Sequence, residues 1–184
     1  MSFDSPFVEY LIIGTHTTLW LLLTAMAIFG IPLSTLMSVD ATQALLALPL
    51  VYLLGMLFDS LTQRSLNPMR KKIRDGLFNY ADLTYRDEYI AIGSPELYSA
   101  YEVRVRRVRV IGAAIYNWPL LGVATLLHLG FSHIGRSVFV VVSALVLGFV
   151  SIIVWRSLYR RAYKFRKNAC DVIRLQPKAE SMDS

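Results

Sequence analysis

The chain has 184 residues, of which 55% are hydrophobic and only 17% are charged. Soluble domains carry about 25% charged residues, so this composition excludes an ordinary soluble globular protein and indicates a membrane protein. The net charge of +6 and the pI near 9.6 are compatible with nucleic-acid binding. However, the bases lie beside apolar runs, where anionic lipid headgroups are the expected partners.

The N-terminal segment and the cysteine content bear on the location of the protein. The first ten residues include Asp4 and Glu9 but no base, so a cleavable signal peptide is not expected and the first apolar run should remain in the mature protein. Cys170 is the single cysteine, which excludes an intrachain disulfide and suits a reducing cytosolic face.

Four charge-free runs predict four transmembrane helices. About 20 apolar residues cross the roughly 30 Å hydrocarbon layer as a helix, and the runs place such helices at about residues 10–31, 42–60, 110–131 and 137–155. The first helix is expected to end before Pro32. The second is the shortest and contains Pro49, so a broken or re-entrant segment is its alternative. The prediction is an all-α integral membrane protein, with a single membrane domain over residues 1–184.

The basic residues predict the orientation of these helices. Ten of the 19 Lys and Arg residues lie between residues 60 and 109, eight lie from Arg156 onward, and the remaining one is Arg136. Because bases stay preferentially on the cytosolic side, both termini and the segment 61–109 are expected in the cytosol. This arrangement requires an even number of spans, and it predicts an integral protein of a bacterial inner (plasma) membrane.

A helix is predicted in the cytosolic segment before the third span. Ser94, Pro95 and Glu96 form a sequence typical of a helix start, and no breaker separates this start from the span. Glu102 and Arg106 are four residues apart, in the order that supports a helix. The alternating Val and Arg residues of this segment also allow a strand, but a strand would need a partner and the alternation breaks at Arg106 and Arg107.

After the fourth span, residues 156–174 are predicted to continue as an amphipathic helix. Its apolar stripe consists of Trp155, Leu158, Ala162, Phe165, Ala169 and Val172. The stripe either lies on the lipid headgroups or docks on the helix that begins after Ser94. Residues 175–184 are polar and are predicted to be disordered.

Three polar residues of different spans carry the sharpest site hypothesis. His16, Asp59 and Asn117 fall in the cytosolic half of the bilayer at 1.5 Å per residue, where ionisable groups normally face the bundle interior. They could form one polar intramembrane layer that holds a cation or a proton. In the structural alternative, His16 and Asn117 bond to neighbouring helices and Asp59 pairs with a base. Small residues, among them Gly14 and Gly55, mark the faces on which the first two spans are expected to pack.

The sequence contains no signature of catalysis or metal binding. HExxH, GxSxG, a Walker glycine loop and a Cys-x-x-Cys pair are all absent, and these would mark the common reaction classes. His128 and His133 are five residues apart, whereas ligands on one helix face are four apart. Neither enzyme activity nor a metal or other cofactor is expected.

The leading hypothesis is a small non-catalytic multi-pass protein that acts as a membrane anchor, sensor or assembly subunit, either as a homo-oligomer or within a larger complex. A basic cytosolic face would bind a partner protein or anionic lipid. The alternative is an oligomeric channel or a membrane-disrupting effector, for example of a bacterial stress or phage-defence system, by analogy of architecture alone. A nucleic-acid or nucleotide binder is the third hypothesis. The basic cytosolic face comprises Arg70, Lys71, Lys72, Arg74, Arg104, Arg106, Arg107, Arg109, Arg160, Arg161 and Lys164.

Overall fold

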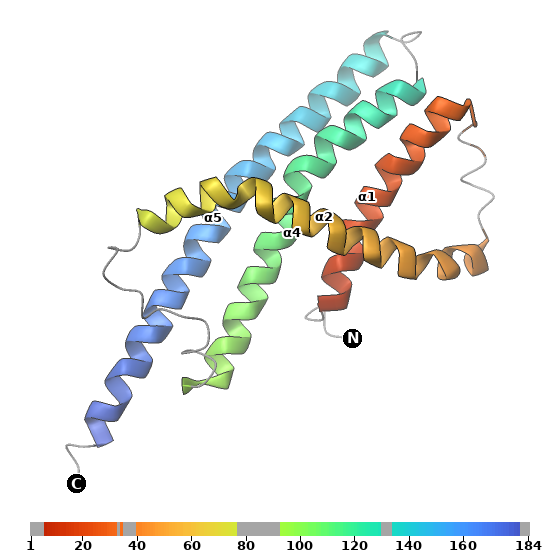
Figure 1. Ribbon diagram of the computed structural model, residues 1–184. Helices are drawn as coiled ribbons and strands as arrows, with labels where there is room; N and C mark the ends of the chain where they lie inside the picture. The colour runs from red at the N-terminus through yellow and green to blue at the C-terminus, as the bar shows by residue number, and fades with distance from the viewer. Residues whose placement is uncertain (1–5, 33, 35–39, 77–92, 130–133, 181–184) are drawn as a thin grey trace. The chain divides into compact units, whose positions relative to one another are not determined.

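The structure is a computed structural model that describes residues 6–32, 34, 40–76, 93–129 and 134–180. These residues form helices and no strand. The long helices are α1 (Pro6–Phe29), α2 (Ala41–Asp75), α4 (Pro95–Leu129) and α5 (Ile134–Glu180), which are shown in Figure 1.

Each of these helices is long and apolar enough to cross a membrane. The chain is therefore a small multi-pass integral membrane protein, and the prediction of an all-α membrane protein is confirmed. Helix α2 continues through Pro49 without a break, so the second predicted span is not a broken segment. Helices α2, α4 and α5 extend well beyond the predicted spans into the basic segments, and α2 does so through Pro68.

The described contacts divide the chain into two compact units. We call residues 1–65 and 109–154 the membrane unit, because they contain the apolar parts of all the helices. Residues 66–108 and 155–184 hold most of the bases, and we call them the basic unit. The assignment of residues 1–184 to a single membrane domain stays a prediction.

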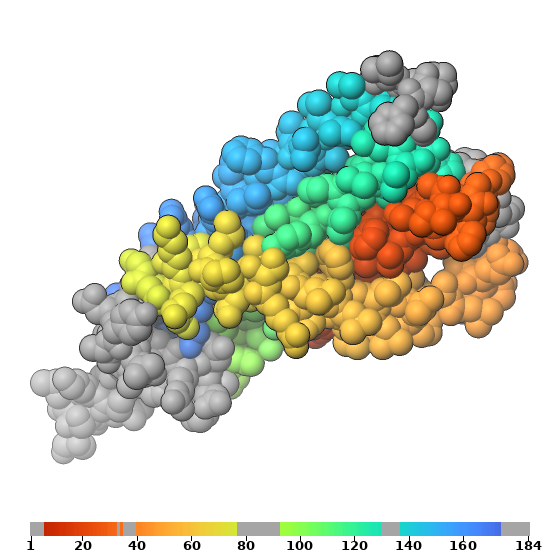
Figure 2. Space-filling model, turned by 45° about the horizontal axis from the view of Figure 1, so that its top comes forward, coloured from red at the N-terminus to blue at the C-terminus, as the bar shows by residue number. Residues whose placement is uncertain are grey.

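In the membrane unit, α1 and α2 make backbone contact through glycines. A Cβ atom added to Gly14 would overlap the carbonyl oxygen of Val51, and one added to Gly55 would overlap the carbonyl oxygen of Tyr10. Figure 1 shows α2 crossing α1 at this contact, and Figure 2 shows α1 lying between α2 and α4. The prediction that the first two spans pack through Gly14 and Gly55 is confirmed, because only glycines permit so close an approach.

A second close contact joins α4 and α5 in the membrane unit. A Cβ on Gly122 would lie 2.5 Å from the Cβ of Ala144, and one on Gly148 would lie 3.1 Å from Cγ of Pro119. Helix α4 continues through Pro119. Small residues thus bring the two helices together around the proline ring, in the manner usual for helices in a bilayer.

In the basic unit, α4 begins where the sequence predicted a helix start. The N–H of Leu97 donates to Oγ of Ser94 at 3.4 Å, and Arg106 pairs with Glu102 at 3.0 Å. Helix α4 runs from Pro95 to Leu129 without interruption. The predicted helix start, its continuation into the third span and the Glu102–Arg106 pair are therefore confirmed.

The C-terminal segment docks on the start of α4. A buried cluster of Ala169, Cys170 and Ile173 packs against Leu97 and Tyr98. This contact confirms docking, one of the two predicted alternatives for the stripe. The predicted membership of the stripe was partly wrong. Val172, a predicted member, is 50% exposed, whereas Tyr159, Cys170 and Ile173, which the prediction left out, are buried. The buried face follows the 3.6-residue period more closely than the predicted one, which drifted toward Val172 at its C-terminal end.

Helix α5 ends later than expected. It continues to Glu180, so the predicted disorder does not hold for residues 175–180, and residues 181–184 lie outside the described ranges. The helix passes through Pro177, which disfavours a helix, and the residues around it, Gln176, Lys178, Ala179 and Glu180, are good helix formers. Extending a helix that already exists requires no new nucleation.

Candidate functional site

Asn117 joins α4 to α1 inside the membrane unit. Its side chain is only 3% exposed. The Oδ1 atom accepts a hydrogen bond from Nε1 of Trp20 at 3.1 Å and another from Oγ1 of Thr17 at 3.4 Å. Sequence analysis missed Trp20, although an indole N–H at membrane depth must find an acceptor, because water is absent there. Asn117 thus acts as an interhelical link, as the structural alternative predicted.

The described hydrogen bond of His16 stays within α1, which corrects the predicted bond to a neighbouring helix. The Nδ1 atom of His16 lies 2.9 Å from the carbonyl oxygen of Ile12, and its ring meets the ring of Trp118 edge-on at 5.5 Å. Among the described residues, no hydrogen bond connects His16 with Asp59 or Asn117. His16 and Asn117 therefore both contribute to the contact between α1 and α4, but through separate partners.

Asp59 is buried near the predicted cytosolic end of the second span. It is 6% exposed, and its Oδ1 accepts a hydrogen bond from Nε2 of Gln63 at 2.8 Å. The structural alternative predicted that Asp59 pairs with Arg64 or Arg107, but the partner of Asp59 among the described contacts is Gln63.

Glu9 is a buried acid that sequence analysis passed over. It is buried in the first turn of α1, where a carboxylate is favoured by the positive end of the helix. The position of Glu9, directly before the first charge-free run, could have identified it from the sequence. His16, Asp59 and Asn117 are thus distributed over distinct contacts, and their joint action as a functional layer stays a prediction.

In the basic unit, several bases of the predicted face are used internally. The guanidinium of Arg70 lies 6.0 Å from the ring centre of Trp155 and 5.6 Å from that of Tyr159. These two rings stack on one another at 5.2 Å. A cation over aromatic faces is attracted by the electron density of the rings, so Arg70 fastens α2 to α5.

Arg104 has a similar role between α4 and α5. Its guanidinium lies 3.9 Å from the ring centre of Phe165, and Nη1 donates to the carbonyl oxygen of Ala100 at 2.6 Å. Arg106 is held by Glu102, and Arg74 by its neighbour Asp75 at 3.3 Å. The exposed members of the predicted face outside these contacts are Lys71, Lys72, Arg107, Arg160, Arg161 and Lys164.

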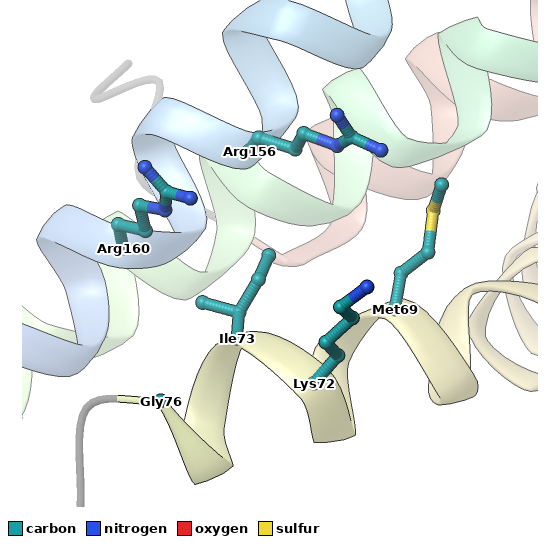
Figure 3. Close-up of a pocket in the computed structure, with 6 residues that line it drawn as sticks. All are labelled: Met69, Lys72, Ile73, Gly76, Arg156 and Arg160. Carbon is teal, nitrogen blue, oxygen red and sulfur yellow. The ribbon is translucent and has the colours of Figure 1, made fainter.

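A pocket lies between the C-terminal end of α2 and the middle of α5 in the basic unit. Its volume is about 370 Å³, and it is lined by Met69, Lys72, Ile73, Gly76, Arg156 and Arg160. Figure 3 shows Met69, Lys72 and Ile73 rising from α2 on the side that faces α5, where Arg156 and Arg160 lie. The pocket therefore combines three cationic side chains with an apolar wall.

The three cations of the pocket have no acidic partner in the part of the chain that the structure describes. The ion pairs Arg74–Asp75 and Arg106–Glu102 do not involve Lys72, Arg156 or Arg160. Sequence analysis placed Lys72 and Arg160 on the basic face but left out Arg156. Its signal was its position, directly after Trp155 at the end of the fourth span and one turn before Arg160.

Metal-binding geometry is absent from the described ranges, where no three His, Cys, Asp or Glu side chains lie together as ligands would. His133 lies outside those ranges. Comparisons with protein-family models, with curated proteins and with solved structures give no match. Function is therefore argued from the chemistry of the sites.

Proposed function

We propose that this protein is a non-catalytic multi-pass component of a bacterial plasma membrane, with both termini in the cytosol, that binds anionic lipid headgroups through its basic cytosolic face. The pocket formed by Lys72, Arg156 and Arg160 carries this proposal. Three cations beside one cavity, without a described acid to neutralise them, favour an anionic ligand. The nearest abundant anions at the end of a membrane span are lipid phosphates.

The exposed bases around the pocket support the same function. Lys71, Arg161 and Lys164 are exposed, and each base near an anionic membrane surface contributes about 1 kcal/mol of attraction. Arg70 and Arg104 instead order the helices that carry these bases. The bound lipids would hold the basic unit at the membrane surface, where it can serve as an anchor or an assembly subunit.

The apolar surface of the membrane unit supports the proposed assembly role. On α5, large side chains such as Phe139, Leu145 and Phe149 are more than half exposed. In a bilayer, such a surface contacts lipid tails or another helix. We propose that the protein works as a homo-oligomer or within a larger complex, and the intact mass of the purified assembly would give its copy number.

Lipid selectivity tests the proposed function. The protein would be purified in mild detergent, exchanged into mixed phosphatidylcholine and phosphatidylglycerol, and weighed intact with its retained lipids. We expect phosphatidylglycerol to be enriched several-fold over its bulk fraction. The Lys71→Gln, Arg161→Gln, Lys164→Gln triple variant should lower this enrichment, whereas Arg136→Gln, the one base outside the predicted cytosolic segments, should not. Equal retention of both lipids by the unmodified protein would refute the proposal, and a retained protein would identify a partner instead.

Cysteine labelling tests the proposed orientation. In a Cys170→Ser background, Asp40→Cys and Lys164→Cys would each carry a single cysteine. A membrane-impermeant maleimide added to intact cells should label Asp40→Cys, and should label Lys164→Cys only after the membrane is opened. The reverse pattern would place the basic face outside and contradict the proposal.

A further inference from the structure

We infer that the pocket between α2 and α5 is a site for the phosphate monoester of an anionic lipid, a ligand class more specific than the general anionic surface, and this inference rests on the proposed function. The side chains of Lys72, Arg156 and Arg160 all line the one cavity, whose volume is about 370 Å³. A phosphate group with several acceptor oxygens can engage several of these donors at once.

The charge of the pocket selects among phosphates. A phosphodiester such as phosphatidylglycerol carries a single negative charge, whereas a phosphate monoester carries about 1.5 to 2 negative charges near neutral pH. Three cations without a described acidic partner are neutralised more fully by a phosphate monoester than by a phosphodiester. Arginine adds geometric selectivity, because its planar guanidinium can donate two parallel hydrogen bonds to one phosphate.

The walls of the pocket point to a lipid rather than a soluble phosphate. Met69 and Ile73 form its apolar side, as Figure 3 shows. Arg156 follows Trp155, the last residue of the predicted fourth span, so the cations begin where the charge-free run ends. An apolar wall next to the cations suits the glycerol and upper acyl chain of a lipid, which a free phosphate lacks.

The pocket is held open by contacts outside its lining. Arg70 lies over the rings of Trp155 and Tyr159, and it precedes Lys72 on α2 while the two rings flank Arg156 on α5. This contact fixes the α2 segment against the α5 segment within the basic unit. Binding therefore requires little ordering of the protein, which preserves affinity.

The test compares phosphatidic acid, a phosphate monoester, with phosphatidylglycerol in otherwise phosphatidylcholine bilayers, and the readout is the retained ratio of the two anionic lipids. We expect the unmodified protein to prefer phosphatidic acid by about fivefold or more, which corresponds to roughly 1 kcal/mol. The Arg156→Gln, Arg160→Gln double variant should lose this preference. The Arg161→Gln, Lys164→Gln double variant removes the same charge from exposed positions of the same helix, and should retain the preference even if total lipid binding falls.

The outcomes separate the two proposals. If the unmodified protein enriches both anionic lipids equally, or if the two double variants lose the preference alike, the pocket assignment is wrong while the proposed function stands. If no anionic lipid is enriched, both proposals fail. A competition with inorganic phosphate distinguishes a lipid from a soluble ligand. Displacement of phosphatidic acid by millimolar phosphate would show a soluble-phosphate site and overturn the lipid assignment.

A conservative variant distinguishes a loss of the guanidinium groups from a loss of the fold. Arg156→Lys with Arg160→Lys keeps both charges but removes the bidentate donors, and helical circular dichroism together with a single size-exclusion peak would confirm its fold. We expect an intermediate preference for phosphatidic acid from this variant. An unchanged preference would show that charge alone acts, and would overturn the assigned role of the two guanidinium groups.

Discussion

Gly14 and Gly55 pack against each other across the contact between α1 and α2. A Cβ on Gly14 would lie 3.1 Å from the backbone nitrogen of Gly55, and a Cβ on Gly55 would lie 3.0 Å from that of Gly14. The relation is reciprocal, and it leaves no flexible side chain that could move aside. The two helices are therefore in contact through their backbones.

Substitution of either glycine should separate α1 from α2. We expect Gly14→Ala and Gly55→Ala each to lower the free energy of unfolding by about 1 to 3 kcal/mol, because the added methyl group overlaps backbone atoms. Thermal unfolding in detergent would measure the loss. Gly76→Ala is the matched control, since its Cβ would meet its nearest neighbour at an ordinary 3.5 Å, and it should change stability by less than about 0.5 kcal/mol. Equal stability of all three variants would contradict the described contact.

Removal of the Asn117 amide should weaken the contact between α1 and α4. In Asn117→Leu the indole N–H of Trp20 loses its acceptor, and we expect a loss of about 0.6 to 2 kcal/mol, the range of interhelical hydrogen bonds in membranes. Thr17→Val should cost less, because the single hydroxyl proton of Thr17 is shared between the carbonyl oxygen of Ile13 at 2.9 Å and Asn117 at 3.4 Å, and Asn117 keeps its bond from Trp20. In a background where the other two tryptophans are replaced by phenylalanine, the emission of Trp20 should change along with the stability. Unchanged stability and emission in Asn117→Leu would argue against the hydrogen bond.

Burial of Cys170 gives a chemical measure of order in the basic unit. Its side chain is fully buried beside Ala169 and Ile173, with Phe165 packed against this cluster. We expect slow alkylation by a soluble maleimide in the native protein and a rate at least about tenfold higher in Phe165→Ala, which removes a packing partner. Val172→Ala alters an exposed neighbour and should leave the rate unchanged. Rapid alkylation of the unmodified protein would mean that the cluster does not form in solution.

Ion flux distinguishes the proposed function from the channel alternative. Liposomes containing the purified protein should release no more trapped potassium than protein-free liposomes, because a binding component has no need of a continuous polar path. The test should be repeated across a range of protein densities, since an oligomeric channel would show flux that rises steeply with density. Such a rise would favour the channel or membrane-disrupting alternative.

The helices and their starts were predictable because they depend on local chemistry. Charge-free runs marked the apolar segments, and Ser94 with Pro95 marked a helix start that the structure confirms. These signals lie within a few residues of the feature that they predict. The same locality explains why the helix was expected to continue from Ser94 into the third span, since no breaker intervenes.

The details that sequence analysis missed depend on which helix lies opposite. Arg70 and Lys72 look equivalent in sequence, yet Arg70 is held over aromatic rings and Lys72 lines a pocket. Trp20 became part of the Asn117 contact only through the packing of α1 on α4. A period of 3.6 residues gives the face of a helix, but a small error in its start displaces distant positions, as happened at Val172.

The placement of Arg70 has a consequence for how binding responds to ionic strength. Its guanidinium is held over Trp155 and Tyr159, so it takes no part in the lining of the pocket, but its positive charge remains. A partly buried charge is screened by salt much less than an exposed one. The field that attracts an anion to the pocket therefore includes a contribution from Arg70 that added salt should weaken less than it weakens the contribution of the exposed bases.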